Sequence, residues 1–391
     1  MKLNCFASRQ IRPIRLITKS TQKQRDSRSV CLRVQYHDKS NTEANPKYKI
    51  LQRTLTNMYS ENKGRINAVM LCSPKDAMCT RFIERCNEDE IAAAKVNWHR
   101  IPPKEAGPET LKDVQIVVTV RFPAVILQYA EKLEWIQFLG AGIEHSLFPE
   151  LLAKDIILTN ASGVHESPIS EHVLGMMLMF ARGLHRCVRM QTKHEWNPAP
   201  FFNQVTELSG ATVGIIGLGA IGGGIARRAK ALGMTVIATK RHPETTAPNV
   251  DILLPFDNLD TLLKSSDYLV LSAPLTAETR GMIGEAQLRK MKPNAVLINI
   301  ARGELIQQDA LILALNEGWI GGAGLDVTVP EPLPDDSPLW DMPNTIISPH
   351  VAGLNPKYGD RAAEIFLHNL KALLENRPAG LINLVDKELG Y

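Results

Sequence analysis

Residues 211–224, Ala-Thr-Val-Gly-Ile-Ile-Gly-Leu-Gly-Ala-Ile-Gly-Gly-Gly, constrain the fold of this chain more than any other stretch. The apolar run at 213–216 is typical of a buried strand, and a helical pattern continues from the glycines to about residue 232. A second apolar run at 234–239 predicts another strand directly afterwards. A glycine-rich turn between a strand and a helix indicates a β-α-β unit with a parallel sheet.

The three glycines of Gly217-Leu-Gly219-Ala-Ile-Gly222 have the spacing of a dinucleotide-binding turn. Gly217 permits a tight turn, Gly219 lets backbone approach a pyrophosphate, and Gly222 lets the helix pack close to the strand. The helix N-terminus then offers free N–H groups and a positive dipole to the phosphates. The context favours a nucleotide site over the alternative, a glycine-rich turn in some other α/β domain.

The rest of the chain alternates strand-like and helical patterns from about residue 66 onward. Expected strands lie at 66–71, 114–120, 135–139, 156–158, 268–271, 295–300, 324–327 and 345–347. Expected helices lie at 77–86, 168–195, 285–291, 309–317 and 357–375, with Ser167 as N-cap and Pro168 as first residue of the long helix. This alternation predicts parallel, doubly wound sheets in a chain long enough for two domains.

The positive charge is concentrated at the N-terminus. Residues 1–34 contain nine Lys or Arg and one acidic residue, so the net charge of +4 becomes about −4 for the rest. This Arg-rich, acid-poor composition favours a mitochondrial presequence, and the alternative is a basic tail with no targeting role. The rest of the chain has no basic surplus to indicate nucleic acid or an anionic membrane as partner, and no run reaches the ~18 apolar residues that a membrane span needs.

The six cysteines and ten histidines show no metal-binding spacing. No CxxC pair is present, and no histidine follows a cysteine at zinc-finger distance. We therefore expect free thiols in a reducing compartment and no metal site.

Three chemically versatile residues, Arg302, Glu331 and His350, follow the carboxyl ends of three expected strands. Each alone has an ordinary interpretation: a surface arginine, a solvated loop carboxylate, a hydrogen-bonded histidine. In an open parallel sheet, however, the carboxyl edge is where ligands bind. Three such residues at the same edge as a nucleotide-binding turn indicate an active site.

Several motifs in the same order resemble the D-isomer-specific 2-hydroxyacid dehydrogenase family. They are the glycine turn, Asn-Ile-Ala-Arg-Gly-Glu-Leu at 299–305, Gly-Leu-Asp-Val at 324–327, Glu-Pro-Leu-Pro at 331–334, Ser-Pro-His-Val-Ala-Gly at 348–353 and Ser-Ala-Pro-Leu-Thr at 272–276. The resemblance covers about residues 66–391. It implies a Rossmann nucleotide-binding domain at 166–354 and a flavodoxin-like substrate domain at 65–165 completed by 355–391, with a cleft between them. Residues 1–64 would be presequence and linker.

The resemblance implies hydride transfer between a nicotinamide cofactor and C2 of a 2-oxo acid. Arg302 would bind the substrate carboxylate and carbonyl, because a guanidinium offers paired donors that match this geometry. His350 would be the acid/base, held by a hydrogen bond to Glu331. The backbone N–H groups of Ala141 and Gly142 would complete the carboxylate site, ahead of Glu144 where the family usually has Asp.

The family also implies a set of cofactor contacts at the ends of the strands. Asp326 would hold the nicotinamide amide, whereas His172 is interpreted as structural. The expected cofactor-binding residues are Gly217, Gly219, Ala220, Ile221, Gly222, Thr239, Lys240, Arg241, Ala273, Pro274, Ile300, Ala301, Asp326, Ala352 and Gly353.

The end of the second strand of the nucleotide unit departs from the pattern of NAD enzymes. These enzymes place an acidic residue there to hold the ribose diol, whereas this strand ends Ala-Thr-Lys-Arg-His at 238–242 and Asp251 lies too far along. Lys240 and Arg241 suit a 2′-phosphate instead. We therefore expect NADP(H) to be favoured over NAD(H), the alternative being that both side chains point to solvent.

The sequence thus predicts an NADP(H)-dependent reductase of a small 2-oxo acid, with glyoxylate or hydroxypyruvate as the expected substrates and a bulkier 2-oxo acid as runner-up. A second hypothesis from another class is a catalytically silent dinucleotide sensor or corepressor on the same scaffold. The presence of Arg302, Glu331 and His350 argues against it. A homodimer is what the family implies.

Overall fold

A computed structural model describes residues 64–241 and 246–387 of the chain. Nearly all of the expected presequence and linker, with Cys5 and Cys31, therefore lies outside the described residues. Within them, Cys72, Cys79, Cys86 and Cys187 are free thiols. No helix of the described part is long and apolar enough to cross a membrane, and its His, Cys, Asp and Glu residues form no cluster that could hold a metal ion.

The N-terminal part of the fold is a five-stranded sheet in the order β2-β1-β3-β4-β5, with every neighbouring pair parallel. Its strands are β1 (Ile66–Leu71), β2 (Val96–Ile101), β3 (Ile116–Thr119), β4 (Trp135–Phe138) and β5 (Ile157–Thr159). The helices between them are α2 (Ala77–Asn87), α3 (Glu90–Lys95), α4 (Pro108–Leu111) and α5 (Pro149–Leu152). Parallel strands need such crossover helices, which cover the sheet and bury its apolar strands on both faces.

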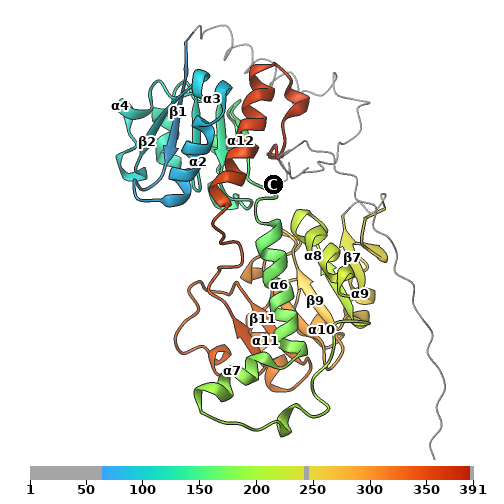
Figure 1. Cartoon of the computed structure of the whole chain (residues 1–391). Coiled ribbons are helices and arrows are strands. Elements are labelled where there is room, and N and C mark those ends of the chain that lie inside the picture. The colour runs from blue at the N-terminus through green and yellow to red at the C-terminus, as the bar shows by residue number, and fades with distance from the viewer. Residues whose placement is uncertain (1–63, 242–245, 388–391) are drawn as a thin grey trace, which may run out of the picture. The chain divides into compact units, whose positions relative to one another are not determined.

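The C-terminal helix α12 (Tyr358–Leu374) packs on this first sheet beside α2, although a long stretch of chain separates it from β5 (Figure 1). The ring of Phe366 stacks on Trp135 of β4 at 4.8 Å between centroids and contacts Phe82 of α2 edge-on at 5.6 Å. These side chains belong to one buried apolar cluster. The last helix therefore completes the core of the N-terminal sheet.

The middle of the chain forms a seven-stranded sheet in the order β12-β11-β10-β9-β6-β7-β8, again with all neighbouring strands parallel. Its strands are β6 (Thr212–Ile216), β7 (Thr235–Lys240), β8 (Ile252–Pro255), β9 (Tyr268–Leu271), β10 (Val296–Asn299), β11 (Gly322–Leu325) and β12 (Thr345–Ile347). Its helices are α6 (Glu166–Ala181), α7 (Leu184–Thr192), α8 (Ala220–Ala231), α9 (Leu259–Ser265), α10 (Glu285–Leu288) and α11 (Gln308–Asn316). The chain order reverses beside β6, and such a switch point is where doubly wound sheets bind ligands. The predicted α/β fold with two parallel sheets is confirmed.

Three predictions about single elements are wrong. The helix expected at 168–195 is broken, because Gly183 takes a left-handed φ of 64° between α6 and α7. Its start is also earlier, since α6 begins at Glu166 with His165 as the N-cap in place of Ser167. The strand expected at 324–327 is β11, two residues upstream, so Asp326 directly follows it.

Strands β2 and β8 are missing from the sequence-based assignment. Both lie at sheet edges, and their side chains are largely half-buried or exposed. An edge strand does not need the continuous apolar run by which the central strands of a parallel sheet are recognised.

Candidate active site

The carboxyl ends of the strands of the seven-stranded sheet bring the expected site residues to one edge. The register pairs Ile216 of β6 with Thr239 of β7 and with Leu271 of β9, and Asn299 of β10 with Leu325 of β11. The expected cofactor and catalytic residues of this sheet follow these ends: 217–222 after β6, 239–241 at the end of β7, 273–274 after β9, 300–302 after β10, 326 and 331 after β11, and 350–353 after β12. One edge of the sheet therefore carries the whole set.

The glycine turn has the geometry that its spacing predicts. Gly217 has a φ of +94°, and a Cβ there would lie 2.7 Å from the backbone of Ala273. A Cβ on Gly222 would collide with the carbonyl oxygen of Gly217. In contrast, a Cβ on Gly219 would meet nothing within 4 Å, and Gly219 is the N-cap of α8. Contacts within the protein therefore exclude a side chain at Gly217 and Gly222. Gly219 instead leaves open space at a helix N-terminus whose first N–H groups have no partner within the helix.

The end of β7 carries a buried hydroxyl and two cations. Thr239 is fully buried, and its Oγ1 has no hydrogen-bond partner in the described part of the chain. Arg241 donates from Nη2 to Glu278 Oε2 at 2.8 Å. Asp251 lies at the opposite end of the strand, where it accepts from the Val236 amide at 2.8 Å. Asp251 is therefore not placed to serve a ribose at the carboxyl edge.

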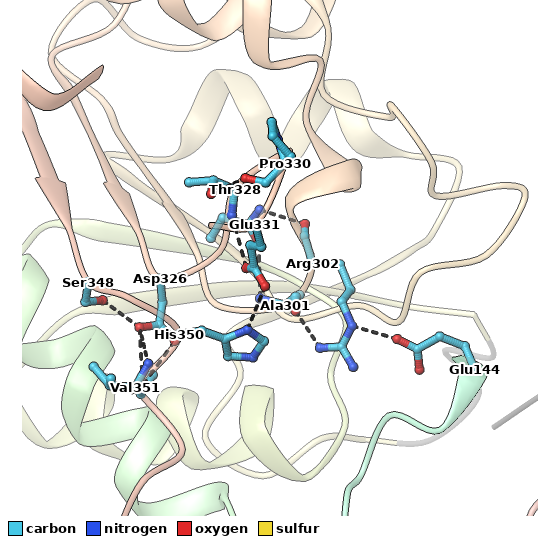
Figure 2. A network of polar contacts seen from close by, with 12 residues as sticks. Glu144, Ala301, Arg302, Asp326, Thr328, Pro330, Glu331, Ser348, His350 and Val351 are labelled. Carbon is cyan, nitrogen blue, oxygen red and sulfur yellow. Dashed lines mark hydrogen bonds and ion pairs between the residues drawn. The ribbon is translucent and has the colours of Figure 1, made fainter. Parts of the chain in front are cut away.

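His350 and Glu331 are paired, although they lie on different loops. The Nδ1 atom of His350 is 3.1 Å from Oε2 of Glu331 (Figure 2). The other carboxylate oxygen of Glu331, Oε1, accepts from the backbone N–H of Thr328 at 3.3 Å. Because Nδ1 faces the carboxylate, Nε2 is the ring nitrogen left to exchange a proton with a ligand.

Arg302 lies near His350 and Glu331, and its guanidinium donates hydrogen bonds to two groups (Figure 2). Its Nε donates to Oε1 of Glu144 at 2.7 Å, and its Nη1 donates to the carbonyl oxygen of Ala301 at 2.8 Å (Figure 2). A Cβ on Gly142 would collide with Nη2 of Arg302. The structure thus brings Arg302 against the turn formed by Ala141 and Gly142, which comes from the N-terminal sheet.

Glu144 is the partner of Arg302 that sequence reasoning did not identify. Burial acts to raise the pKa of the Glu144 carboxyl, but the hydrogen bond and charge of Arg302 outweigh it, so that pKa lies below its ordinary value. Glu144 is therefore an anion at neutral pH. Its place two residues after Gly142 is the only signal in the sequence for this contact.

Asp326 is buried, with 3% of its surface exposed, and its carboxylate is bonded to the loop that carries His350. Oδ1 accepts from Ser348 Oγ at 2.6 Å and from the Val351 amide at 3.0 Å (Figure 2). Oδ2 accepts from the Ala352 amide at 3.1 Å. His172 reaches the same group through Ser348. In the sequence, Ser348 stands out only as part of the Ser-Pro-His-Val-Ala-Gly motif, and no pattern there predicts this network.

Comparison with known proteins gives one consistent result. Residues 174–352 match the family model described as D-isomer specific 2-hydroxyacid dehydrogenase, NAD binding domain. A glyoxylate reductase of Thermofilum pendens is 35% identical over 305 residues, which is 75% of this chain and 88% of that protein. A glycerate dehydrogenase of Methylorubrum extorquens is 34% identical over 282 residues, 70% of this chain and 87% of that protein.

Solved structures show the same likeness. The NADPH-dependent glyoxylate/hydroxypyruvate reductase of Sinorhizobium meliloti, solved with NADP and sulfate, superposes with a TM-score of 0.70 at 27% identity. The match covers 84% of this chain and 100% of that one. The similarity therefore extends over both sheets.

Proposed function

Because the chain belongs to the D-isomer specific 2-hydroxyacid dehydrogenase family and is an oxidoreductase, we propose that it reduces a small 2-oxo acid with NADP(H). Glyoxylate and hydroxypyruvate are the proposed substrates. The names of its relatives, glyoxylate reductase and glycerate dehydrogenase, support small substrates over bulky ones. The observation that carries the proposal is the convergence of Arg302, Glu331 and His350 at the edge that holds the glycine turn.

His350 is the proposed acid/base. Glu331 accepts from Nδ1, which fixes the imidazole orientation and leaves Nε2 to give a proton to the carbonyl oxygen of the substrate. This arrangement of a histidine and a carboxylate is the one expected of a general acid whose proton must be ready when negative charge develops on the substrate oxygen.

Arg302 is the proposed carboxylate-binding residue. Its Nε and one N–H of Nη1 are already used, and its Nη2 lies next to Gly142. The backbone N–H groups of Ala141 and Gly142 are proposed to complete the site. A guanidinium and two amides together can bind both oxygens of a carboxylate and orient the adjacent carbonyl.

The residues at the strand ends fit a dinucleotide. When bound, the nicotinamide supplies the hydride, which is the cofactor's own chemistry. The open space at Gly219 and the first amides of α8, from Ala220 and Ile221, suit a pyrophosphate. Lys240 and Arg241 are proposed to bind a 2′-phosphate, and the NADPH dependence of the Sinorhizobium relative supports this preference.

A turnover assay tests the proposal. NADPH oxidation should be measured with a panel of 2-oxo acids for the wild type and for His350→Ala, together with NADPH binding followed by fluorescence. We expect the variant to lose nearly all turnover while NADPH still binds. Unchanged turnover in His350→Ala would contradict the acid/base role, and no turnover by the wild type with any 2-oxo acid would favour the silent sensor or corepressor.

Two further parts of the proposal concern the whole protein. Residues 1–34 are proposed to direct it to mitochondria, which a fusion of these residues to a fluorescent protein would test.

A homodimer is proposed from the family and supported by apolar side chains exposed on α7 and the segment after it, Leu184, Val188, Trp196 and Phe202. Light scattering in solution measures the oligomeric state directly.

A further inference from the structure

A chain of hydrogen bonds links helix α6 to the loop that carries His350. Nε2 of His172, on α6, lies 3.0 Å from Ser348 Oγ, and Ser348 Oγ lies 2.6 Å from Oδ1 of Asp326. Asp326 is almost fully buried, and a buried carboxylate is tolerated only when hydrogen bonds replace its lost hydration. Neither His172 nor Ser348 has a role in the chemistry proposed above.

The direction of these bonds follows from the groups involved. An ionised carboxylate only accepts, so the single hydroxyl hydrogen of Ser348 points to Asp326. The oxygen of Ser348 must then accept from His172, which requires a hydrogen on Nε2 of the imidazole. The order is therefore His172 Nε2–H to Ser348 Oγ–H to Asp326 Oδ1, and each member fixes the orientation of the next.

The end of this chain holds the backbone on both sides of His350. Asp326 accepts from the Val351 and Ala352 amides with its carboxylate and from the His350 amide with its backbone carbonyl, at 2.9 Å. His350 itself has a φ of 53°, a left-handed conformation that is unfavourable for a residue with a side chain. Such a conformation persists only where surrounding contacts over-determine it, and the Asp326 bonds are among those contacts, together with the 3.0 Å bond from the His350 amide to the Ser348 carbonyl oxygen.

We propose that His172 and Ser348 are positioning residues for His350, acting through Asp326. They fix the carboxylate that locks the 350–352 backbone, and this keeps the imidazole aligned with Glu331. The inference rests on the proposed function, in which His350 is the acid/base. A small misplacement of such a group slows the chemical step strongly while leaving ground-state binding nearly unchanged.

Ser348→Ala and Ser348→Thr form the first test. The alanine variant removes the hydroxyl, and we expect kcat to fall about 10- to 100-fold while KM for the 2-oxo acid stays within about two-fold. The threonine variant keeps the hydroxyl and should recover most of kcat. His172→Leu should act like Ser348→Ala, and His172→Gln, which retains an N–H donor, should act like Ser348→Thr.

Amide hydrogen exchange gives a readout that does not depend on activity. In Ser348→Ala, the amides of His350, Val351 and Ala352 should exchange faster than in the wild type, because their acceptor is less well fixed. Ser266→Ala is the matched control, since Ser266 is also buried and donates at 2.6 Å, but to the carbonyl of Leu262 at the C-terminal end of α9. It should leave exchange at 350–352 unchanged.

The outcomes separate this inference from the proposed function. Wild-type kcat and exchange in Ser348→Ala would overturn the positioning role while leaving His350 as acid/base. A loss confined to cofactor affinity would overturn it as well, because it would assign the network to the cofactor alone. Faster exchange at 350–352 in Ser348→Ala, together with unchanged turnover in His350→Ala, would have a different meaning. The His172–Ser348–Asp326 hydrogen bonds would then fix the 350–352 backbone, but the proposed acid/base function would be wrong.

Discussion

The guanidinium of Arg302 and the carboxylate of Glu144 form an ion pair with 2.7 Å between Nε and Oε1, and they come from different sheets. The residue proposed to bind an anionic substrate therefore already has an anion beside it. The negative charge of Glu144 offsets the positive charge of Arg302. Arg302 therefore attracts a 2-oxo acid less strongly than it would without Glu144. The contact with Gly142 keeps the remaining donors of Arg302 close to the backbone turn.

We expect Glu144→Gln to lower KM for a 2-oxo acid about five-fold, with a smaller change in kcat. The amide oxygen of glutamine can still accept from Nε, so the variant removes charge while keeping the bond. The side chains of Arg302 and Glu144 are 32% and 42% exposed, and the charge effect is therefore discounted to roughly 1 kcal/mol. Steady-state kinetics at low salt measures it.

Glu285→Gln is the control for this change, since Glu285 is in a surface ion pair with Arg289. It should leave KM unaltered. A higher KM in Glu144→Gln would show that the charge of Glu144 assists substrate binding, contrary to the expectation.

Alanine at Gly219 and at Gly222 should separate cofactor binding from folding. Gly219 has an ordinary φ of −90°, and a Cβ there would meet no other atom within 4 Å. We therefore expect the melting temperature of Gly219→Ala to stay near the wild type while the Kd for NADPH rises about ten-fold or more.

Gly222→Ala should instead lose about 2–4 kcal/mol of unfolding free energy, because its Cβ would meet the backbone of Gly217. Thermal melts and fluorescence titration measure the two effects, and a stable, normally binding Gly222→Ala would contradict the packing argument.

The sequence predicts the central parts of both sheets well, because buried parallel strands such as β9 and β10 are short, largely apolar runs with clear ends. The three residues proposed to be catalytic could also be placed, since Arg302, Glu331 and His350 each follow a recognisable strand. The break between α6 and α7 at Gly183 is harder to predict from the sequence, because a glycine inside a helical pattern is often tolerated. The Arg302–Glu144 pair and the His172–Ser348–Asp326 chain could not be predicted, because they join residues 158, 176 and 22 positions apart whose approach depends on tertiary packing.

The cofactor preference should depend on Arg241. A planar guanidinium pairs well with a phosphate, so we expect Arg241→Ser to lower kcat/KM for NADPH about ten-fold or more and to change kcat/KM for NADH less than about two-fold. Glu278→Gln removes the acidic partner of Arg241 and should improve NADPH binding. An equal loss of kcat/KM with NADPH and NADH in Arg241→Ser would show that Arg241 does not bind the 2′-phosphate.

The stability of the protein should depend on pH through His165. Its Nδ1 lies 3.2 Å from the carbonyl oxygen of Gly353, and its ring packs at 4.9 Å from that of Tyr358. Burial lowers the pKa of His165, and the charges of Arg361 and His350 lower it further, against a raising effect of the bond to Gly353. The folded protein therefore binds this proton less readily than the unfolded chain, in which a histidine has its ordinary pKa near 6.5.

Between the folded pKa and about 6.5, the unfolded chain carries more protons at this site, so the free energy of unfolding must fall as the pH is lowered through that window. His165→Asn keeps an N–H donor for Gly353 but does not titrate, and it should lose less stability than the wild type between pH 7 and pH 5. Urea unfolding at several pH values measures the difference. His185, whose pKa burial also lowers, is present in both proteins and cancels in the comparison. An identical pH dependence for the two proteins would mean that His165 gains its proton as readily in the folded state as in the unfolded one.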